Sequence, residues 1–203
     1  MSTTPANQDP HAWQLYVELE DVQPKVWRRL LVPLTVDLSR LHVMLLWGTG
    51  WDGGHVHEFI FDHDHYGATE PGREFPDDLM PEEDVTLSEA LGKRKSFKYL
   101  YDFGDAWWHK VKVEKIVKLN APLEYAQCIA GENACPPEDV GGSSGYEEFL
   151  EALADPEHAQ HDDMVRWSGR PFDPEDARID RIIERLNHLA KKWAPKPTKP
   201  KAP

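Results

Sequence analysis

The chain has 203 residues, of which 40% are apolar and 29% are charged, and this composition excludes a disordered or collagen-like chain. Its length is about 1.4 times that of a typical domain, so we expect one domain with appendages. The formal net charge of -13 at pH 7 repels phosphate backbones and argues against nucleic-acid binding by the chain as a whole.

The chain carries no sign of membrane insertion or secretion. Its longest purely apolar run, residues 43–47, is far shorter than the ~20 residues that a membrane-spanning helix needs. The N-terminus lacks the basic and apolar regions of a secretory signal. Cys128 and Cys135 are too few for a disulfide framework and are expected to be thiols in a reducing compartment. We therefore expect a cytoplasmic protein.

The first half of the chain predicts strands around one buried helix. Residues 13–19 alternate apolar and polar side chains, which is the period of a half-buried strand. Residues 26–32 form a second β-rich run. Asp37 can cap a helix over residues 38–47, which Gly48 would end.

A third strand is predicted at residues 55–61, followed by a long acidic loop to Pro81. Thr86 and Glu89 have the spacing of a capping box, so a short helix can begin at Leu87. Residues 97–101 and 107–113 alternate around a turn, which predicts a hairpin with His109 on its buried face.

The second half predicts mainly helices. Ser144 and Glu147 form another capping box, for a helix that runs to Leu153, and Asp173 with Pro174 can begin the last helix. The expected fold class is therefore α+β: a single domain, with a mixed or mostly antiparallel sheet and helices packed on it. The expected organisation is a disordered N-terminus at residues 1–12, the domain at 13–193, and a disordered tail rich in Lys and Pro at 194–203.

Charge is unevenly distributed along the chain. Residues 93–118 hold eight basic and three acidic residues, between acidic segments at 62–92 and 119–165. This basic segment suggests a surface for an acidic ligand, but ion pairing with the acidic flanks is the simpler explanation. Both interpretations stay open.

Four histidines and two aspartates fall within eleven residues around the third predicted strand. His55 and His57 are two residues apart, so on a strand their rings would point to the same side and could share a metal ion, with His109 as a further ligand. Asp102 and Asp105 would add carboxylates or orient an imidazole. The alternative is that each histidine is a hydrogen-bonded part of the core.

The loop at residues 136–142 is a second candidate. Its prolines stiffen the chain and its glycines permit a tight turn, so Glu138 and Asp139 could be held for a ligand, a cation or a partner's arginine. The alternative is that these carboxylates cap backbone amides or pair with the basic strand 110–118.

Several short motifs follow one another in order over residues 13–190. They are Val26-Trp27-Arg28-Arg29 with Pro33, Leu41-His42, Gly50-Trp51, His55-Val56-His57-Glu58-Phe59, Tyr101-Asp102-Phe103-Gly104-Asp105 with Trp107 or Trp108 and His109, Cys128 through Cys135-Pro136-Pro137-Glu138-Asp139-Val140-Gly141-Gly142, and Gly145-Tyr146. In this series the chain resembles the Ri-plasmid open-reading-frame-three-like family, also called the insertion-element passenger TnpR family. The resemblance implies an α+β fold found on chromosomes, plasmids and mobile elements. It implies no activity and no catalytic residues.

No complete catalytic motif is present, so we expect a non-enzymatic binding or interaction module with a protein or small-molecule partner. Its ligand-binding residues would be Asp102, Asp105, Glu138 and Asp139. The first alternative is a metal-dependent enzyme in which His55, His57 and His109 hold a divalent transition metal. The second is a nucleic-acid accessory factor of a mobile element.

Overall fold

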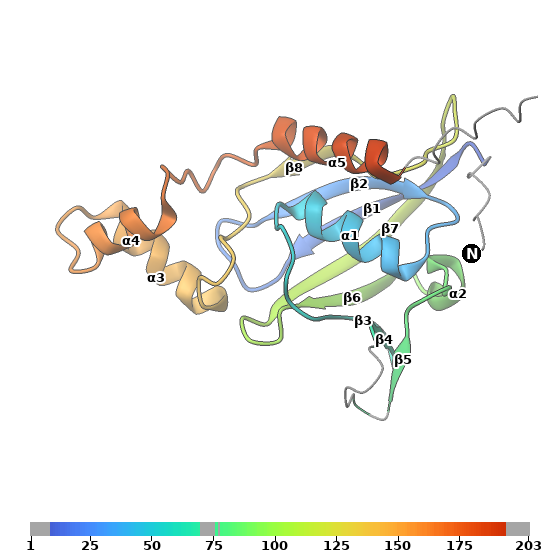
Figure 1. The fold of residues 1–203 in the computed structure, drawn as a ribbon, viewed down its shortest axis with the longest axis horizontal. Helices are drawn as coiled ribbons and strands as arrows, with labels where there is room; N and C mark the ends of the chain where they lie inside the picture. The colour runs from blue at the N-terminus through green and yellow to red at the C-terminus, as the bar shows by residue number, and fades with distance from the viewer. Residues whose placement is uncertain (1–8, 70–75, 77, 194–203) are drawn as a thin grey trace, which may run out of the picture.

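A single mostly antiparallel sheet forms the centre of the molecule in this computed structural model, which describes residues 9–69, 76 and 78–193 (Figure 1). The strand order is β5-β4-β3-β6-β7-β1-β2-β8, and of its neighbouring pairs β4 and β5 alone are parallel. The strands are β1 (His11–Leu19), β2 (Trp27–Pro33), β3 (His57–Phe61), β4 (Asp64–Gly67), β5 (Leu79–Pro81), β6 (Ser96–Tyr101), β7 (Trp107–Lys118) and β8 (Gln127–Glu132).

Helices cover one face of this sheet and extend beyond one end of it. In Figure 1, α1 and α5 lie across the same face, where α1 contacts β2 and α5 contacts both β8 and α1. Helices α3 and α4 pack on each other at the left of the view, beyond the end of the sheet. The helices are α1 (Leu38–Thr49), α2 (Leu87–Leu91), α3 (Gly142–Ala154), α4 (His161–Ser168) and α5 (Ile179–Trp193). The predicted α+β class with a mostly antiparallel sheet is confirmed.

The hydrophobic core lies between the sheet and the helices. Strand β1 buries Leu15, Val17 and Leu19 and leaves the intervening side chains half-buried, as its two-residue period predicts. Helix α1 is buried on several sides because its apolar residues face both the sheet and α5. Aromatic side chains from β3, β6 and β7 fill the rest of this core: Phe59, Phe61, Phe97, Tyr99, Tyr101 and Trp107.

Local signals placed several elements correctly. The Asp37 side chain accepts a hydrogen bond from the Arg40 amide at 2.8 Å and caps α1. Thr86 and Glu89 form the predicted capping box at the start of α2. Strands β6 and β7 form the predicted hairpin, although β7 continues to Lys118.

The sequence predicts that helix α1 ends at Gly48, but the structure differs. The helix continues to Thr49, and Gly50, with a φ of 129°, takes the position after its end. Gly48 therefore lies inside the helix. The position favours glycine because a Cβ here would be only 2.8 Å from the Leu30 Cδ1 atom. Close packing of the helix on β2, and not helix termination, explains this glycine.

Strand β3 begins at His57, so the prediction that His55 lies on the strand is wrong. The residues before it form an irregular segment with Gly53 and Gly54 at positive φ. The acidic stretch before Pro81 is not all loop, because β4 and β5 lie within it.

The second half of the chain differs more from prediction. Helix α3 begins at Gly142 without a side-chain cap, so the capping box at Ser144 is not formed. Helix α5 begins at Ile179, several residues after Pro174. Strand β8 and helix α4 were not predicted.

The predicted terminal segments are tested only in part. Strand β1 begins at His11, so the ordered domain starts earlier than the expected residue 13. The disorder expected for residues 1–8 and 194–203 falls outside the described residues. Within the described ranges, no helix combines the length and apolar character that crossing a membrane requires.

Candidate functional site

Three irregular segments meet beyond the ends of β3, β6 and β8: residues 50–56, the β6–β7 turn, and the loop between β8 and α3. Glu138 joins them, because its Oε1 atom accepts hydrogen bonds from the Tyr101 hydroxyl at 2.9 Å and from the Asp52 and Gly53 amides at 3.2 Å. The Trp51 indole donates a hydrogen bond to the Pro136 carbonyl at 2.9 Å. Glu138 therefore accepts hydrogen bonds from backbone amides, which is the alternative that the sequence analysis left open for it.

Asp105 and Gly142 hold the β6–β7 turn against the start of α3. The Asp105 Oδ2 atom accepts a hydrogen bond from the Gly141 amide at 3.1 Å. At Gly142, which has a φ of 71°, a Cβ would lie only 2.6 Å from the Asp105 carbonyl oxygen. The close approach and the left-handed backbone both require glycine at this position.

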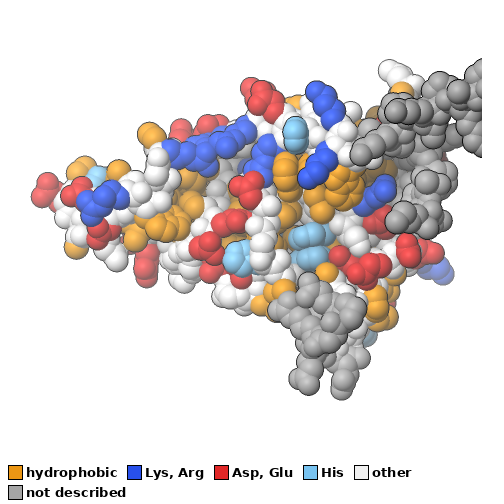
Figure 2. Space-filling model, in the orientation of Figure 1, with side chains coloured by type: hydrophobic (Ala, Val, Ile, Leu, Met, Phe, Trp, Pro, Cys, Tyr) orange, Lys and Arg blue, Asp and Glu red, His pale blue; other side chains and the backbone are white. Residues whose placement is uncertain are grey.

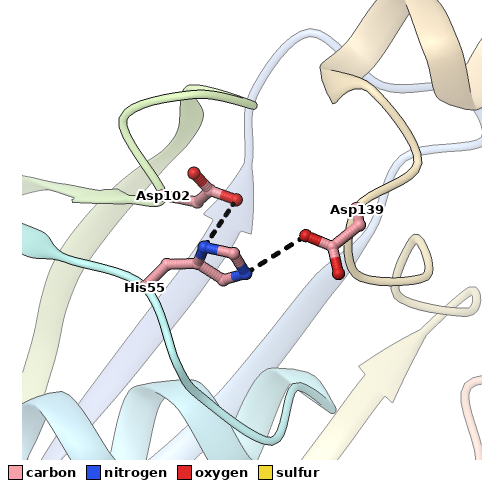
Figure 3. A group of neighbouring side chains, drawn as sticks. All are labelled: His55, Asp102 and Asp139. Atoms are coloured by element: carbon pink, nitrogen blue, oxygen red, sulfur yellow. Dashed lines mark ion pairs between the residues drawn. The ribbon is translucent and has the colours of Figure 1, made fainter.

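The imidazole of His55 lies between two carboxylates at this junction (Figure 3). Its Nδ1 atom is 3.4 Å from the Asp102 Oδ2 atom, and its Nε2 atom is 3.3 Å from the Asp139 Oδ1 atom. One ligand atom from each of the three residues lies within 4.8 Å of the others. We call His55, Asp102 and Asp139 the rim cluster.

Backbone conformation explains why aspartates occupy two of these positions. Asp102 and Asp139 have φ values of 57° and 59°, in the left-handed region that Asp and Asn tolerate better than most residues. The Asp102 Oδ1 atom accepts a hydrogen bond from the Gly104 amide at 2.9 Å, which leaves Oδ2 directed at His55. Thus the turn that places Asp102 also orients its second oxygen.

Solvent exposure differs across the rim cluster. The Asp102 side chain is 12% exposed, whereas that of Asp139 is 73% exposed. The cluster is therefore held from the protein side by Asp102 and open to solvent at Asp139. The His55 side chain is 32% exposed, so part of its ring also faces solvent.

The structure does not bring His57 to His55. The His57 Nε2 atom lies 2.7 Å from the buried carboxylate of Glu82, and its ring stacks on His42 with centroids 3.5 Å apart. The His42 Nδ1 atom is 2.7 Å from the Tyr99 hydroxyl, and burial, with a smaller effect of His57, lowers the pKa of His42 to about 3.

His109 is also separate from the rim cluster. It is 0% exposed, and its Nδ1 atom donates to the carbonyls of Trp107 at 3.0 Å and Tyr99 at 3.2 Å. Burial lowers its pKa to about 4, so the ring is neutral at pH 7. The prediction of one site formed jointly by His55, His57 and His109 is wrong, because two of these imidazoles are enclosed in the core.

The sequence identified the members of the rim cluster but not their grouping. His55 was predicted as a metal ligand, and Asp102 and Asp139 as ligand-binding residues. Glu82, the partner of His57, was not predicted, because it lies between the expected loop, which ends at Pro81, and the expected helix, which begins at Leu87. Its position directly after the short apolar run that forms β5 is the one local signal for it.

Ion pairs within the molecule account for part of the basic segment. Arg94 contacts the carboxylates of Asp62 at 2.6 Å and Asp64 at 3.2 Å, and Lys98 pairs with Glu20. These acids belong to other strands or turns of the same sheet. Arg94 therefore pairs with the acidic flank at residues 62–92, as the second interpretation of the basic segment expects.

The fold and the rim cluster define an α+β protein with an eight-stranded sheet and a carboxylate–imidazole group beyond its strand ends. A similar fold occurs in the crystal structure of MM3350, a protein of unknown function from Methanosarcina mazei Go1, with a TM-score of 0.74 and 36% sequence identity. The match covers 83% of this chain and 95% of that one.

Residues 11–181 match the family model described as plasmid pRiA4b ORF-3-like protein, and the chain belongs to this family. The uncharacterized protein y4hQ of Sinorhizobium fredii (strain NBRC 101917 / NGR234) is 40% identical over 186 residues. That alignment covers 90% of this chain and 94% of y4hQ. The family resemblance drawn from the ordered motifs is thus confirmed.

Proposed function

We propose that the protein is a non-enzymatic binding module whose rim cluster binds a divalent transition-metal ion. The observation that carries the proposal is the position of the His55 imidazole between the carboxylates of Asp102 and Asp139, with one side open to solvent. Imidazole nitrogens and carboxylate oxygens are ligands that zinc and related metals accept.

The spacing of the His55 Nε2 and Asp139 Oδ1 atoms fits a shared metal ion. Two ligand atoms at about 2.1 Å from a tetrahedral metal are roughly 3.4 Å apart, and the observed separation is 3.3 Å. The two nitrogens of one imidazole cannot bind the same ion. We therefore assign His55 Nε2 and Asp139 as metal ligands and Asp102 as the carboxylate that orients the ring through Nδ1.

The surroundings of Asp139 favour binding of a larger ligand beside the metal. A pocket of about 180 Å³ between α3 and α4 is lined by Asp139 together with the apolar side chains of Phe149, Met164 and Trp167. Helix α4 has no buried residue, so its apolar side chains remain accessible. Solvent or the bound ligand would complete the coordination of the ion.

Metal titration of protein purified without a histidine tag tests the proposal. We expect one Zn²⁺, Ni²⁺ or Mn²⁺ ion per chain in calorimetry, and at least an approximately tenfold loss of affinity in His55→Ala and Asp139→Asn. Asp139→Asn keeps a side chain that tolerates the left-handed backbone. His63→Ala is the matched control, because His63 is exposed and lies outside the cluster.

Binding that is unchanged in His55→Ala and Asp139→Asn would contradict the assignment. So would the absence of saturable binding by any of the three metals. Both outcomes are distinguishable from misfolding, since circular dichroism and thermal unfolding of the same samples report whether each variant folds.

The Asp102–His55 pair favours a second candidate, a metal-dependent enzyme. A carboxylate that orients an imidazole is a common arrangement for general-base catalysis. Assays with phosphate-ester, carboxylic-ester and peptide substrates separate the candidates: turnover that disappears with metal removal supports the enzyme, whereas stoichiometric metal binding without turnover supports the binding module.

A further inference from the structure

A pocket of about 230 Å³ that no residue of the rim cluster lines lies between the C-terminal end of α1, the loop after β8, and the connection from α4 to α5. Its lining includes five arginines from two distant parts of the sequence, β2 and residues 170–185: Arg28, Arg170, Arg178, Arg181 and Arg185. In a chain of net charge -13, this concentration of cations is unexpected. Figure 2 shows basic side chains gathered along the connection between α4 and α5.

Arg28 forms the inner wall of this pocket and is only 1% exposed. Its terminal nitrogens donate to the carbonyls of Trp27 and Glu132 at 2.8 Å, of Asn133 at 2.9 Å, and of Thr49 and Ala177 at 3.4 Å. Its Nε atom has no hydrogen-bond partner in the part of the chain that the structure describes. Carbonyl dipoles stabilise the cation but do not neutralise it, and a buried charge is costly without a counter-ion.

Arg170 and Arg181 lie at the mouth of the pocket. Over residues 9–69, 76 and 78–193, neither guanidinium has a hydrogen bond or an ion pair. Burial, followed by the positive charges of Arg178 and Arg181, lowers the pKa of Arg170. The unpaired guanidinium groups therefore repel one another across a space that an anion can occupy.

The acidic side chains that line the pocket have other partners. Asp52 pairs with Arg185, and Asp176 lies 3.7 Å from Arg178. Glu138 accepts hydrogen bonds from the three donors described above. Asp52 offsets part of the repulsion on Arg170, but among the described residues none of these carboxylates forms an ion pair with Arg28, Arg170 or Arg181.

The N-terminal end of α5 adds to the positive potential. Arg178 directly precedes this 15-residue helix, and its first turn reaches the pocket through Arg181 and Ile182. The amide groups at a helix N-terminus favour anions. Trp51 and Phe172 supply apolar walls for the organic part of a ligand.

We propose that this pocket binds a small organic oxyanion, a phosphate monoester or a carboxylate, which Arg170 and Arg181 hold by charge-assisted hydrogen bonds while Arg28 contributes its positive charge from the inner wall. Planar guanidinium groups match the oxygens of both anions. The ligand supplies the negative charge that the buried Arg28 lacks. The inference is independent of the metal site, since none of its three arginines belongs to the rim cluster.

Calorimetric titration of the full chain with phenyl phosphate, benzoate and inorganic phosphate, at constant ionic strength in chloride, tests this site. We expect saturable binding of at least one of them, and the comparison of phenyl phosphate with benzoate identifies the preferred group. The double variant Arg170→Gln/Arg181→Gln should bind at least about tenfold more weakly. Arg28 is left unchanged because it is part of the core.

Arg166→Gln is the matched control, because Arg166 is exposed on α4 and does not line the pocket. It should bind the anion like the unmodified chain. Absence of saturable binding in the millimolar range for all three anions would overturn the proposal. Equal affinity in the unmodified chain and in the double variant would also overturn it.

Discussion

The histidines of this protein occupy two regions with opposite properties. His57 and His109 lie in the core, where Glu82 contacts the His57 Nε2 atom and backbone carbonyls accept from the His109 Nδ1 atom. Among the described residues, the His109 Nε2 atom has no hydrogen-bond partner. His55, only two residues before His57, lies outside the sheet between two carboxylates. The start of β3 at His57 separates the two regions.

This difference shows that spacing alone does not define a metal site. The two histidines of a His-x-His pair point to the same side when both lie in one strand, and here His57 does but His55 does not. Here the buried histidines are structural and should control stability. The rim cluster is held by turns and is open to solvent, so it should control ligand binding with little effect on stability.

Substitution Gly142→Ala should lower both the stability of the fold and the metal affinity of the rim cluster. The new Cβ would clash with the Asp105 carbonyl oxygen, and the φ of 71° adds backbone strain. We expect a loss of roughly 3–4 kcal/mol in the free energy of unfolding, together with weakened metal binding. Urea denaturation measures the first effect.

Gly169→Ala provides the control for Gly142→Ala. Gly169 has a similar φ of 64°, but a Cβ there meets no atom within 4 Å. It should cost only about 1 kcal/mol. Equal losses in the two variants would show that the contact between Asp105 and Gly142 does not hold the rim cluster in place.

Substitution His109→Ala should affect the core alone. It removes the hydrogen bonds to the Tyr99 and Trp107 carbonyls and leaves a cavity beside Trp51. We expect a loss of about 3 kcal/mol in unfolding free energy. Metal affinity in calorimetry should stay unchanged, and a parallel loss of metal binding would contradict the division into two regions.

Low pH should destabilise the folded protein because His109 is buried in its neutral form. The pKa of His109 is about 4 in the folded protein, against about 6.5 in an unfolded chain. Below pH 6.5 the unfolded chain therefore binds a proton that the folded protein excludes, and stability falls until about pH 4. At pH 5 the loss from His109 is about 2 kcal/mol.

Denaturation at pH 7 and pH 5 measures this contribution. The pH-dependent loss should be smaller by about 2 kcal/mol in His109→Ala than in the unmodified protein. His42, whose pKa is also lowered, should leave a residual loss of the same sign in that variant. Identical pH dependence in both proteins would show that His109 does not titrate as its burial requires.

Substitution Asp139→Asn should have the smallest effect on stability. The side chain is largely exposed, and Asn tolerates the φ of 59°. We expect a change below about 0.5 kcal/mol in unfolding free energy. A larger change in chemical denaturation would indicate that Asp139 supports the loop structurally and not as a ligand.

The sequence predicted those elements whose signals are local. The Asp37 cap, the capping box at Thr86 and the alternation of the β6–β7 hairpin lie within a few residues of the structure that they specify. Strand β8 was missed because it buries only Cys128 and contains Gly131, and α4 was missed because it buries no residue.

The candidate site was predictable only as separate residues. Contacts among His55, Asp102 and Asp139 depend on how Glu138 and Asp105 tie three loops together, and sequence spacing does not report such ties. The arginine pocket was missed for the same reason. Its one sequence signal is the alternation in β2, which places Arg28 on the same face as Leu30 and Val32.

Nuclear magnetic resonance of the imidazole nitrogens during Zn²⁺ titration tests the division between the two regions most directly. Long-range proton–nitrogen spectra resolve the ring nitrogens of each histidine, with His55→Ala to assign the resonances. We predict that the His55 Nε2 resonance shifts at one equivalent of metal while the resonances of His57 and His109 stay unchanged. A shift at His57 or His109 with His55 unaffected, or no shift at any histidine, would contradict it.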